Sequence, residues 1–109
     1  MNAHISKEPS GDQVSAAASL LKLVSDPTRL KILWALLHGE HSVGELAGHV
    51  GVQPAAVSQH LAKLRIAHIV GVRREGTKMF YQAENEHVRS LIEQALSQAS
   101  HVITGVPHD

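Results

Sequence analysis

Histidine offers more chemistry than any other side chain in this sequence, because nine of the 109 residues are histidine and none is cysteine. Imidazole is the commonest metal ligand among protein side chains. The lack of cysteine excludes disulfides, thiolate nucleophiles and sulfur metal sites. Four histidines fall at expected turns or helix ends and fit surface or capping roles: His38, His41, His49 and His68. Candidates for binding roles are the other five: His4, His60, His87, His101 and His108.

A second set of polar side chains follows one helical face in residues 54–64. The outward face combines small and hydrogen-bonding residues: Ala55, Ala56, Gln59 and Lys63, with Ser58 and His60 on its flanks and Gln53 just before it. Small residues let a helix approach another surface closely, and Ser, Gln, His and Lys hydrogen-bond to base edges in the DNA major groove. This composition is typical of a recognition helix.

The element that must position this face is a pair of helices joined by a tight turn, in residues 42–64. Ser42 and Glu45 have the spacing of a capping box, and Gly51 suits the left-handed end of the first helix. Pro54 suits the first turn of the second helix. The inward positions of that helix are apolar: Val57, Leu61 and Leu64. The pattern predicts a helix-turn-helix; the alternative is an ordinary helical hairpin with a solvated outer face.

Two β-prone runs follow, in residues 69–72 and 79–81, with Glu75-Gly76 as the turn signal between them. They predict a two-stranded hairpin whose tip carries Arg73, Arg74 and Lys78. Such charges are also common on solvated hairpin tips. Directly after a recognition-type helix, a basic hairpin is better explained as a wing that contacts phosphates or a minor groove.

Charge is distributed unevenly along the chain although its formal sum is zero. Residues 53–83 hold five basic residues and one acid, whereas residues 84–109 hold four acids and one base. A positive region beside a negative one orients a protein on a phosphate backbone. Together with the helix-turn-helix and the wing, this pattern predicts a sequence-specific DNA-binding regulator. An enzyme is not indicated, because the sequence has no nucleophile–histidine–acid pattern and no phosphate-binding glycine loop.

The remaining helices are expected at residues 14–24, after Asp26-Pro27 as far as Gly39, and at residues 86–104 behind the cap Asn85. The apolar stripe of the last helix is too long for a core of this size to cover. We therefore expect it to form a twofold homodimer interface with residues 14–24. The expected fold is mainly α with a small β-hairpin: a winged helix-turn-helix of five helices, dimeric through the first and last.

One domain is expected over residues 13–104, between a mobile tail at residues 1–12 and a short tail at residues 105–109. The sequence has no apolar run long enough to cross a bilayer and no secretory segment. A soluble cytoplasmic protein without a membrane partner is therefore expected.

The order of these elements resembles the ArsR/SmtB family of winged-helix metal-sensing repressors, over residues 14–101. Three motifs carry the resemblance: Asp26-Pro27-Thr28-Arg29, Val57-Ser58-Gln59-His60-Leu61, and Arg74-Glu75-Gly76 followed by Phe80-Tyr81. The resemblance implies a homodimer that holds operator DNA and releases it when an effector binds. It also implies base contacts from Ser58 and Gln59 first, and then from Gln53, His60 and Lys63.

The same resemblance implies a metal site on the last helix. Where the family has one aspartate and three histidines, this chain has Asn85, His87, Gln98 and His101, so two of four ligands are kept. The sequence around His87 is most similar to the nickel/cobalt-sensing branch, in which chain ends supply further ligands. Here those ends offer His108 and His4. The expected effector is Ni(II), Co(II) or Zn(II).

His87 and His101 cannot share an ion within one helix, because 14 residues separate them by roughly 21 Å along its axis. Around the axis they lie only about 40° apart. Across an antiparallel twofold pair, His87 of one chain can meet the partner's His101, and two symmetric sites would then straddle the interface. The alternative is a DNA-binding module that has lost its own sensor and depends on a co-regulator protein for its response.

Overall fold

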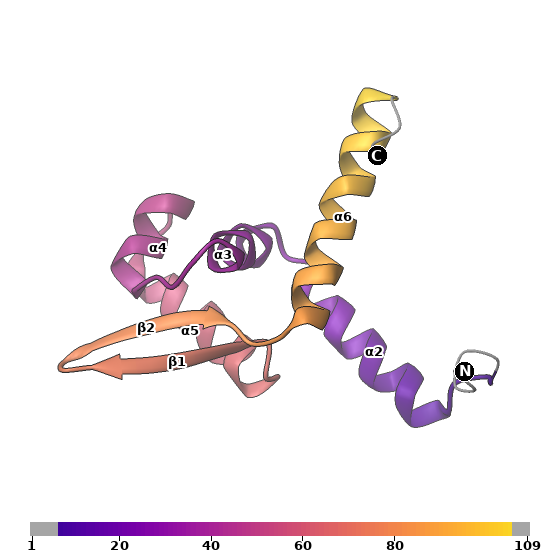
Figure 1. Ribbon diagram of the computed structural model, residues 1–109, viewed down its shortest axis with the longest axis horizontal. Coiled ribbons are helices and arrows are strands. Elements are labelled where there is room, and N and C mark those ends of the chain that lie inside the picture. Colours follow the sequence, from indigo (N-terminus) through magenta and orange to yellow (C-terminus); the bar gives the residue numbers. More distant parts are fainter. Residues whose placement is uncertain (1–6, 106–109) are drawn as a thin grey trace.

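The computed structural model describes residues 7–105 and places five α-helices and one antiparallel hairpin within them (Figure 1). The helices are α2 (Gly11–Val24), α3 (Pro27–Leu37), α4 (Val43–Val50), α5 (Pro54–Ile66) and α6 (Glu86–Thr104). The strands are β1 (Val70–Glu75) and β2 (Lys78–Ala83). This is the element order predicted from the sequence, so the expected mainly α fold with a small hairpin is confirmed.

Short polar motifs set the helix boundaries. The predicted capping box is confirmed, because Ser42 Oγ accepts from the Glu45 amide at 3.2 Å and Glu45 Oε1 accepts from the Ser42 amide at 2.8 Å. Ser10 and Gln13 form a second capping box, which starts α2 at Gly11. Residues 11 and 12, expected in the mobile tail, are therefore helical. The sequence did not predict this start, because Pro9 and Gly11 on either side of Ser10 are typical of turns.

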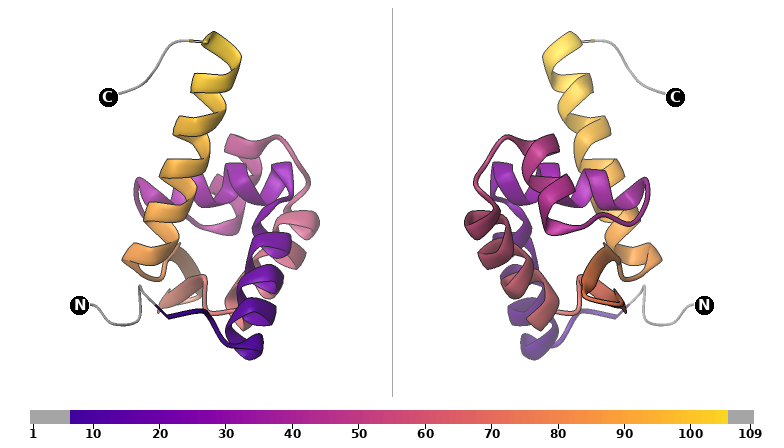
Figure 2. Two further views of the ribbon diagram at one scale, coloured as in Figure 1. Left: turned by 90° about the vertical axis from the view of Figure 1, so that its right-hand side faces the viewer. Right: turned by 90° about the vertical axis from the view of Figure 1, so that its left-hand side faces the viewer.

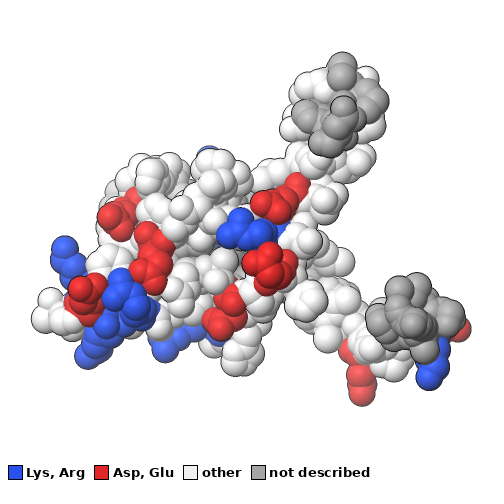
Figure 3. Space-filling view, in the orientation of Figure 1, with Lys and Arg blue, Asp and Glu red and all other residues white. Residues whose placement is uncertain are grey.

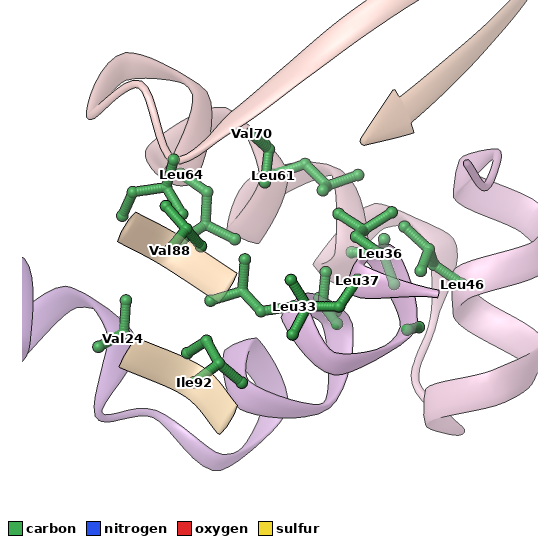
Figure 4. Close-up of a cluster of buried hydrophobic side chains, with 14 of the residues drawn as sticks. Val24, Leu33, Leu36, Leu37, Leu46, Leu61, Leu64, Val70, Val88 and Ile92 are labelled. Carbon is green, nitrogen blue, oxygen red and sulfur yellow. The ribbon is translucent and has the colours of Figure 1, made fainter. Parts of the chain in front are cut away.

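The hydrophobic core lies where α3, α4, α5 and the base of α6 meet (Figure 4). Helix α3 is its centre, because apolar residues occupy most of its circumference and five of them are buried: Ile32, Leu33, Ala35, Leu36 and Leu37. Leu46 of α4, Leu61 and Leu64 of α5, and Ile92 of α6 pack around it. Each such side chain stabilises the fold by about 1.5–3 kcal/mol when fully buried. Burial against α3 therefore fixes which side of α5 faces solvent.

Helices α2 and α6 project from this core as two arms (Figures 1 and 2). Helix α2 buries only Val24 of its 14 residues, and α6 buries only Val88 and Ile92 of its 19. The other large apolar side chains of both arms lie open, including Leu21 at 51% exposure and Val102 at 70%. Although apolar on one side, neither arm has the length and hydropathy to cross a membrane, and the same holds for the other described helices.

Arg89 anchors the α6 arm to the core. Its Nη2 donates to the Leu37 carbonyl at 2.8 Å, at the end of α3 where carbonyls lack partners within the helix. Glu86 and Glu93 lie on either side of the guanidinium, with N–O distances of 3.8 and 3.6 Å. The base of α6 is thereby fixed to the same helix that positions α5.

The wing is longer than the sequence predicted. Its ladder runs from Val70 opposite Ala83 to Glu75 opposite Lys78, so the basic residues expected at the tip are part of the strands. The tip is the two-residue turn Gly76-Thr77, and the positive φ of 64° at Gly76 suits glycine. Charged residues have low β-propensity, so the sequence predicted shorter strands. They are nevertheless tolerated in a strand whose sides face solvent.

Candidate nucleic-acid interface

The α4–turn–α5 unit presents one polar side of α5 to solvent. Gly51 takes the left-handed conformation at φ 79°, and its amide donates to the Ala47 carbonyl at 2.9 Å, which ends α4. Pro54 opens α5 after the extended residue Gln53. Because Val57, Leu61 and Leu64 are buried, the opposite side of α5 is exposed. The predicted helix-turn-helix is confirmed.

Several predicted DNA contacts lie on that exposed side. Ser58, Gln59 and Lys63 are all exposed. Gln53 is exposed at the N-cap of α5, and its side chain makes no capping hydrogen bond. These amide, hydroxyl and ammonium groups can therefore point outward and hydrogen-bond to base edges or phosphates.

His60, which was also predicted to contact DNA, has a hydrogen-bond partner within the chain. The ring is half-buried, and its Nδ1 accepts a hydrogen bond from Arg29 Nε at 3.1 Å. Arg29 Nη1 also donates to the Leu23 carbonyl of α2 at 2.9 Å. One guanidinium thus joins the end of the α2 arm to the recognition helix. Arg29 belongs to the Asp26-Pro27-Thr28-Arg29 motif, but nothing in the sequence indicated a partner 31 residues away.

Asp26 completes the junction at the start of α3. Its Oδ2 accepts from the Arg29 amide at 3.0 Å, as the predicted cap requires. This backbone hydrogen bond holds the pKa of the Asp26 carboxyl below its ordinary value, with the nearby His60 and Arg29 side chains acting in the same direction. The carboxylate therefore stays charged beside the guanidinium that reaches α5.

Arg73 is occupied within the molecule. Its Nη2 lies 2.9 Å from Glu40 Oε1, its Nη1 lies 3.0 Å from Glu75 Oε1, and its Cζ lies 5.0 Å from the Phe80 ring centroid. The hydrogen bond from Arg73 lowers the pKa of Glu40, and the same carboxylates raise the pKa of Arg73. Arg73 thus holds the wing to the loop before α4, a role that was not predicted.

Arg74 lies on the opposite side of the wing, because successive side chains of a strand alternate and Arg73 and Arg74 pair with Phe80 and Met79. It has no ion pair or side-chain hydrogen bond to any residue the structure describes. Tyr81, on the same side of the hairpin as Met79, lines a groove of about 450 Å³ together with Ser58. The Arg74 side of the wing is therefore the side that borders α5.

Ser58 also borders a second groove, of about 460 Å³, that Lys78 lines from the wing. The predicted base contact Ser58 and the predicted wing cation Lys78 thus line the same groove. Figure 3 shows basic side chains at the wing end of the molecule with acidic ones among them, and acidic side chains around a basic one near the base of α6.

The predicted metal ligands are not brought together within one protomer. His87 and His101 are exposed on α6, and His4 and His108 lie outside the described residues. Within residues 7–105, no three His, Asp or Glu side chains are placed to hold an ion. Asn85, at a family ligand position, caps α6 by accepting from the Val88 amide at 3.1 Å. Its carboxamide is therefore already used by the helix.

Known proteins with the same architecture identify the family. The sequence-family model described as "Bacterial regulatory protein, arsR family" matches residues 26–71 of this chain. The transcriptional regulator KmtR of Mycobacterium tuberculosis is 48% identical over 96 residues, which cover 88% of this chain and 74% of KmtR.

Two solved structures have the same fold along nearly the whole chain. The homodimeric winged helix-turn-helix domain Mb0332 from Mycobacterium bovis has a TM-score of 0.82 at 26% identity, covering 100% of this chain and 99% of that one. The AntR antimony-specific transcriptional repressor has a TM-score of 0.81 at 25% identity, covering 95% and 96%. This chain belongs to the ArsR family of bacterial regulatory proteins and is a DNA-binding transcriptional regulator rather than an enzyme.

Proposed function

We propose that the chain acts as a homodimer on a palindromic operator and changes its operator affinity when a transition-metal ion binds. The observation that carries this proposal is the contrast between an exposed polar face of α5 and two apolar arms that no other part of residues 7–105 covers. A protein that works on chromosomal or plasmid DNA acts in the cytoplasm, in agreement with the sequence expectation.

The dimer is proposed to form through α2 and α6. Leu20, Leu21, Leu96, Val102 and Ile103 are among the exposed large apolar side chains of the molecule. Water contact at these positions is unfavourable, and a twofold partner removes it on both chains at once. The homodimeric state of the Mb0332 domain supports this arrangement. Two copies of α5 would then lie on two half-sites, as a palindrome requires.

Each DNA contact is proposed for a side chain that is exposed, and the role depends on whether that side chain already has a partner within the chain. Gln59 and Ser58 read base edges, and Gln53 and Lys63 contact the adjacent backbone. Arg74 contacts phosphates from the side of the wing that borders α5, and Lys78 contacts them from the tip, next to the turn Gly76-Thr77. His60 and Arg73 orient the helix and the wing through their internal partners rather than contacting DNA directly.

The metal response is proposed to act through α6. Imidazole nitrogens suit Ni(II), Co(II) and Zn(II), and a bound ion would supply a fixed bridge between the two chains. His87 of one protomer and the partner's His101 would be its ligands, with His108 or His4 completing the shell. The specificity of AntR for antimony supports an inorganic effector. The alternative, dependence on a co-regulator protein, is not favoured by these relatives.

The DNA-binding proposal is tested by operator affinity as a function of salt. We expect Lys63→Ala to reduce the slope of log affinity against log salt by about 1, because one phosphate contact is lost. The matched control is Lys31→Ala, which removes the same charge from α3, away from the α5 face. Equal slopes for the two variants would contradict the proposed interface.

The metal proposal needs its own measurement. Ni(II), Co(II) and Zn(II) are titrated separately into wild type and a His87→Ala, His101→Ala variant, with and without operator. We expect the variant to lose one ion per protomer and its metal-dependent change in operator affinity. If stoichiometry and operator release matched wild type, the α6 site would be ruled out while the DNA-binding proposal would stand.

A further inference from the structure

A cavity of about 500 Å³ opens between α3, α4 and α6, apart from the DNA-facing side of α5 and from His87 and His101. Aliphatic side chains and Trp34 form most of its wall, with Lys31 at its edge. Three histidines also line it: His38, His41 and His49. The sequence suggested only surface or capping roles for these three, and the proposed function uses none of them.

Backbone hydrogen bonds fix the orientation of two of these rings. His38 Nδ1 lies 2.8 Å from the Trp34 carbonyl oxygen, and His41 Nδ1 lies 2.9 Å from the Gly39 carbonyl oxygen. Because a carbonyl oxygen only accepts, each Nδ1 carries the proton and donates it. In a neutral ring the lone pair then lies on Nε2. This is the arrangement found in metal-binding histidines, whose second nitrogen donates to a carbonyl or carboxylate.

The separation of His41 and His49 is compatible with a shared ion. Their ring centroids lie 5.2 Å apart, with the rings at 80° to each other. Two imidazoles that bind one tetrahedral ion through bonds of about 2.0–2.1 Å have centroids roughly 5 Å apart. His38, in contrast, lies against the indole of Trp34 at a centroid distance of 4.2 Å. Neither nitrogen of His49 has a hydrogen bond within residues 7–105.

We propose that His41 and His49 bind a divalent transition-metal ion of the zinc class, through Nε2 of His41 and a ring nitrogen of His49. No third His, Asp or Glu among the described residues is placed to join them. With two protein ligands, the ion keeps open coordination positions for water or a small anion from the cavity. This pair is separate from the proposed α6 site and lies within one protomer.

The pair bridges two parts of the DNA-binding unit. The backbone of His41 forms a β-bridge with Tyr81, through hydrogen bonds of 3.1 and 2.8 Å, so it moves with strand β2 of the wing. His49 lies in the last turn of α4, the first helix of the helix-turn-helix. A bound ion would therefore connect the wing to α4 and restrict their relative motion.

The test uses the full chain with ZnCl₂ as the probe. Zinc is titrated into wild type, His49→Gln and the control His38→Gln, which removes an imidazole from the same cavity but leaves the pair intact. Imidazole ¹⁵N chemical shifts report which ring nitrogens bind the ion. We expect His49→Gln to weaken zinc binding at this site by at least about tenfold, since a ligand matters no less than its second-shell partner. The His38→Gln variant should keep wild-type affinity.

Hydrogen exchange at the Tyr81 amide adds a second measurement, because non-specific zinc binding at the surface would not change this exchange rate. Zinc should slow this exchange in wild type and not in His49→Gln, because the Tyr81 amide donates to the His41 carbonyl. The proposal would be overturned if zinc left the His41 and His49 ring signals unshifted, or if His38→Gln weakened binding as much as His49→Gln. The His87→Ala, His101→Ala variant should retain this site, which separates its outcome from that of the α6 site.

Discussion

The DNA-reading half of the molecule and its two arms handle their apolar residues in different ways. In the reading half, formed by α3, α4, α5 and the wing, most large apolar side chains converge on α3, which alone buries five residues, although Trp34 and Ile66 stay exposed. In the arms, α2 and α6 repeat apolar residues just as regularly but bury one and two. One half therefore has a core of its own, and the other half ends in apolar surfaces that no other described residue of the chain covers.

This difference shows what helical periodicity can and cannot reveal. The period indicates that a side of a helix avoids water, and it is the same whether the cover comes from its own chain or from another. For α6 the length of the stripe was decisive, because it continues past Ile92, where the core ends. Substitutions in the two regions should therefore damage different properties, folding stability in the reading half and dimerisation in the arms.

The largest effect is expected from charges placed on the arms. Leu21→Glu combined with Val102→Glu should abolish dimerisation, because carboxylates would be buried without partners. Operator affinity should fall by about a thousandfold, toward non-specific binding, since a single recognition helix reads one half-site. Sedimentation measures the dimer, and fluorescence anisotropy measures operator binding.

The matched control for the arms adds the same charge to their polar sides. Ser19→Glu with Ser90→Glu changes two exposed residues of the same two helices. This variant should stay dimeric and keep most of its operator affinity. If both pairs of substitutions dissociated the dimer equally, added charge rather than a specific interface would be responsible, and the arms would not be the dimer surface.

The next largest effect separates the core from the arms by stability. Leu61→Ala removes a side chain that is 1% exposed and should lower the free energy of unfolding by about 2–5 kcal/mol. Ile103→Ala removes one that is 82% exposed and should change it by less than about 0.5 kcal/mol while the protein is monomeric. Urea unfolding at low protein concentration checks both. A large loss for Ile103→Ala under those conditions would mean that the arm packs on its own chain.

Local sequence signals were enough to predict most of the fold. The bounds of α6, the capping box at Ser42 and the left-handed Gly51 each depend on residues within one or two turns of each other. Such signals act through the backbone hydrogen bonds of a helix end, which adjacent residues satisfy. The start of α2 was missed for the opposite reason, because turn-forming neighbours masked the cap at Ser10.

The site was predicted less completely, because two of its side chains are occupied by distant partners. Arg29 reaches His60 across 31 residues, and Arg73 reaches Glu40 across 33. Before α3 and the wing are placed, Arg73 and Arg74 are equivalent basic neighbours. Only strand alternation and the position of Glu40 separate the arginine that holds the wing from the one that remains free.

A smaller effect on DNA binding should distinguish these two arginines. Arg74→Ala should weaken operator binding by about tenfold and reduce the salt slope by about 1, because a phosphate contact is lost. Arg73→Ala should leave the salt slope unchanged, because its charge is already paired with Glu40 and Glu75. Operator titrations at several salt concentrations measure both. A reduced slope for Arg73→Ala alone would show that the wing turns its other side to DNA.

The smallest expected effect concerns acid stability at the junction between the arm and the reading half. The pKa of Asp26 is lowered in the folded protein, chiefly by the hydrogen bond from the Arg29 amide. Below its ordinary value of 3.8, the unfolded chain therefore binds more protons at this carboxyl than the folded one does. The charged carboxylate thus stabilises the fold above that pH, and this contribution is lost as the pH falls through the lower folded value.

Asp26→Asn isolates this contribution, because asparagine still caps a helix but cannot titrate. Wild type should be the more stable protein at neutral pH, and its free energy of unfolding should fall more steeply than that of the variant as the pH drops from about 5 toward 3. Urea unfolding across that range measures the two slopes. Parallel curves would show that the carboxylate charge beside Arg29 does not stabilise the junction, and the link from α2 through Arg29 to His60 would then depend on hydrogen bonding alone.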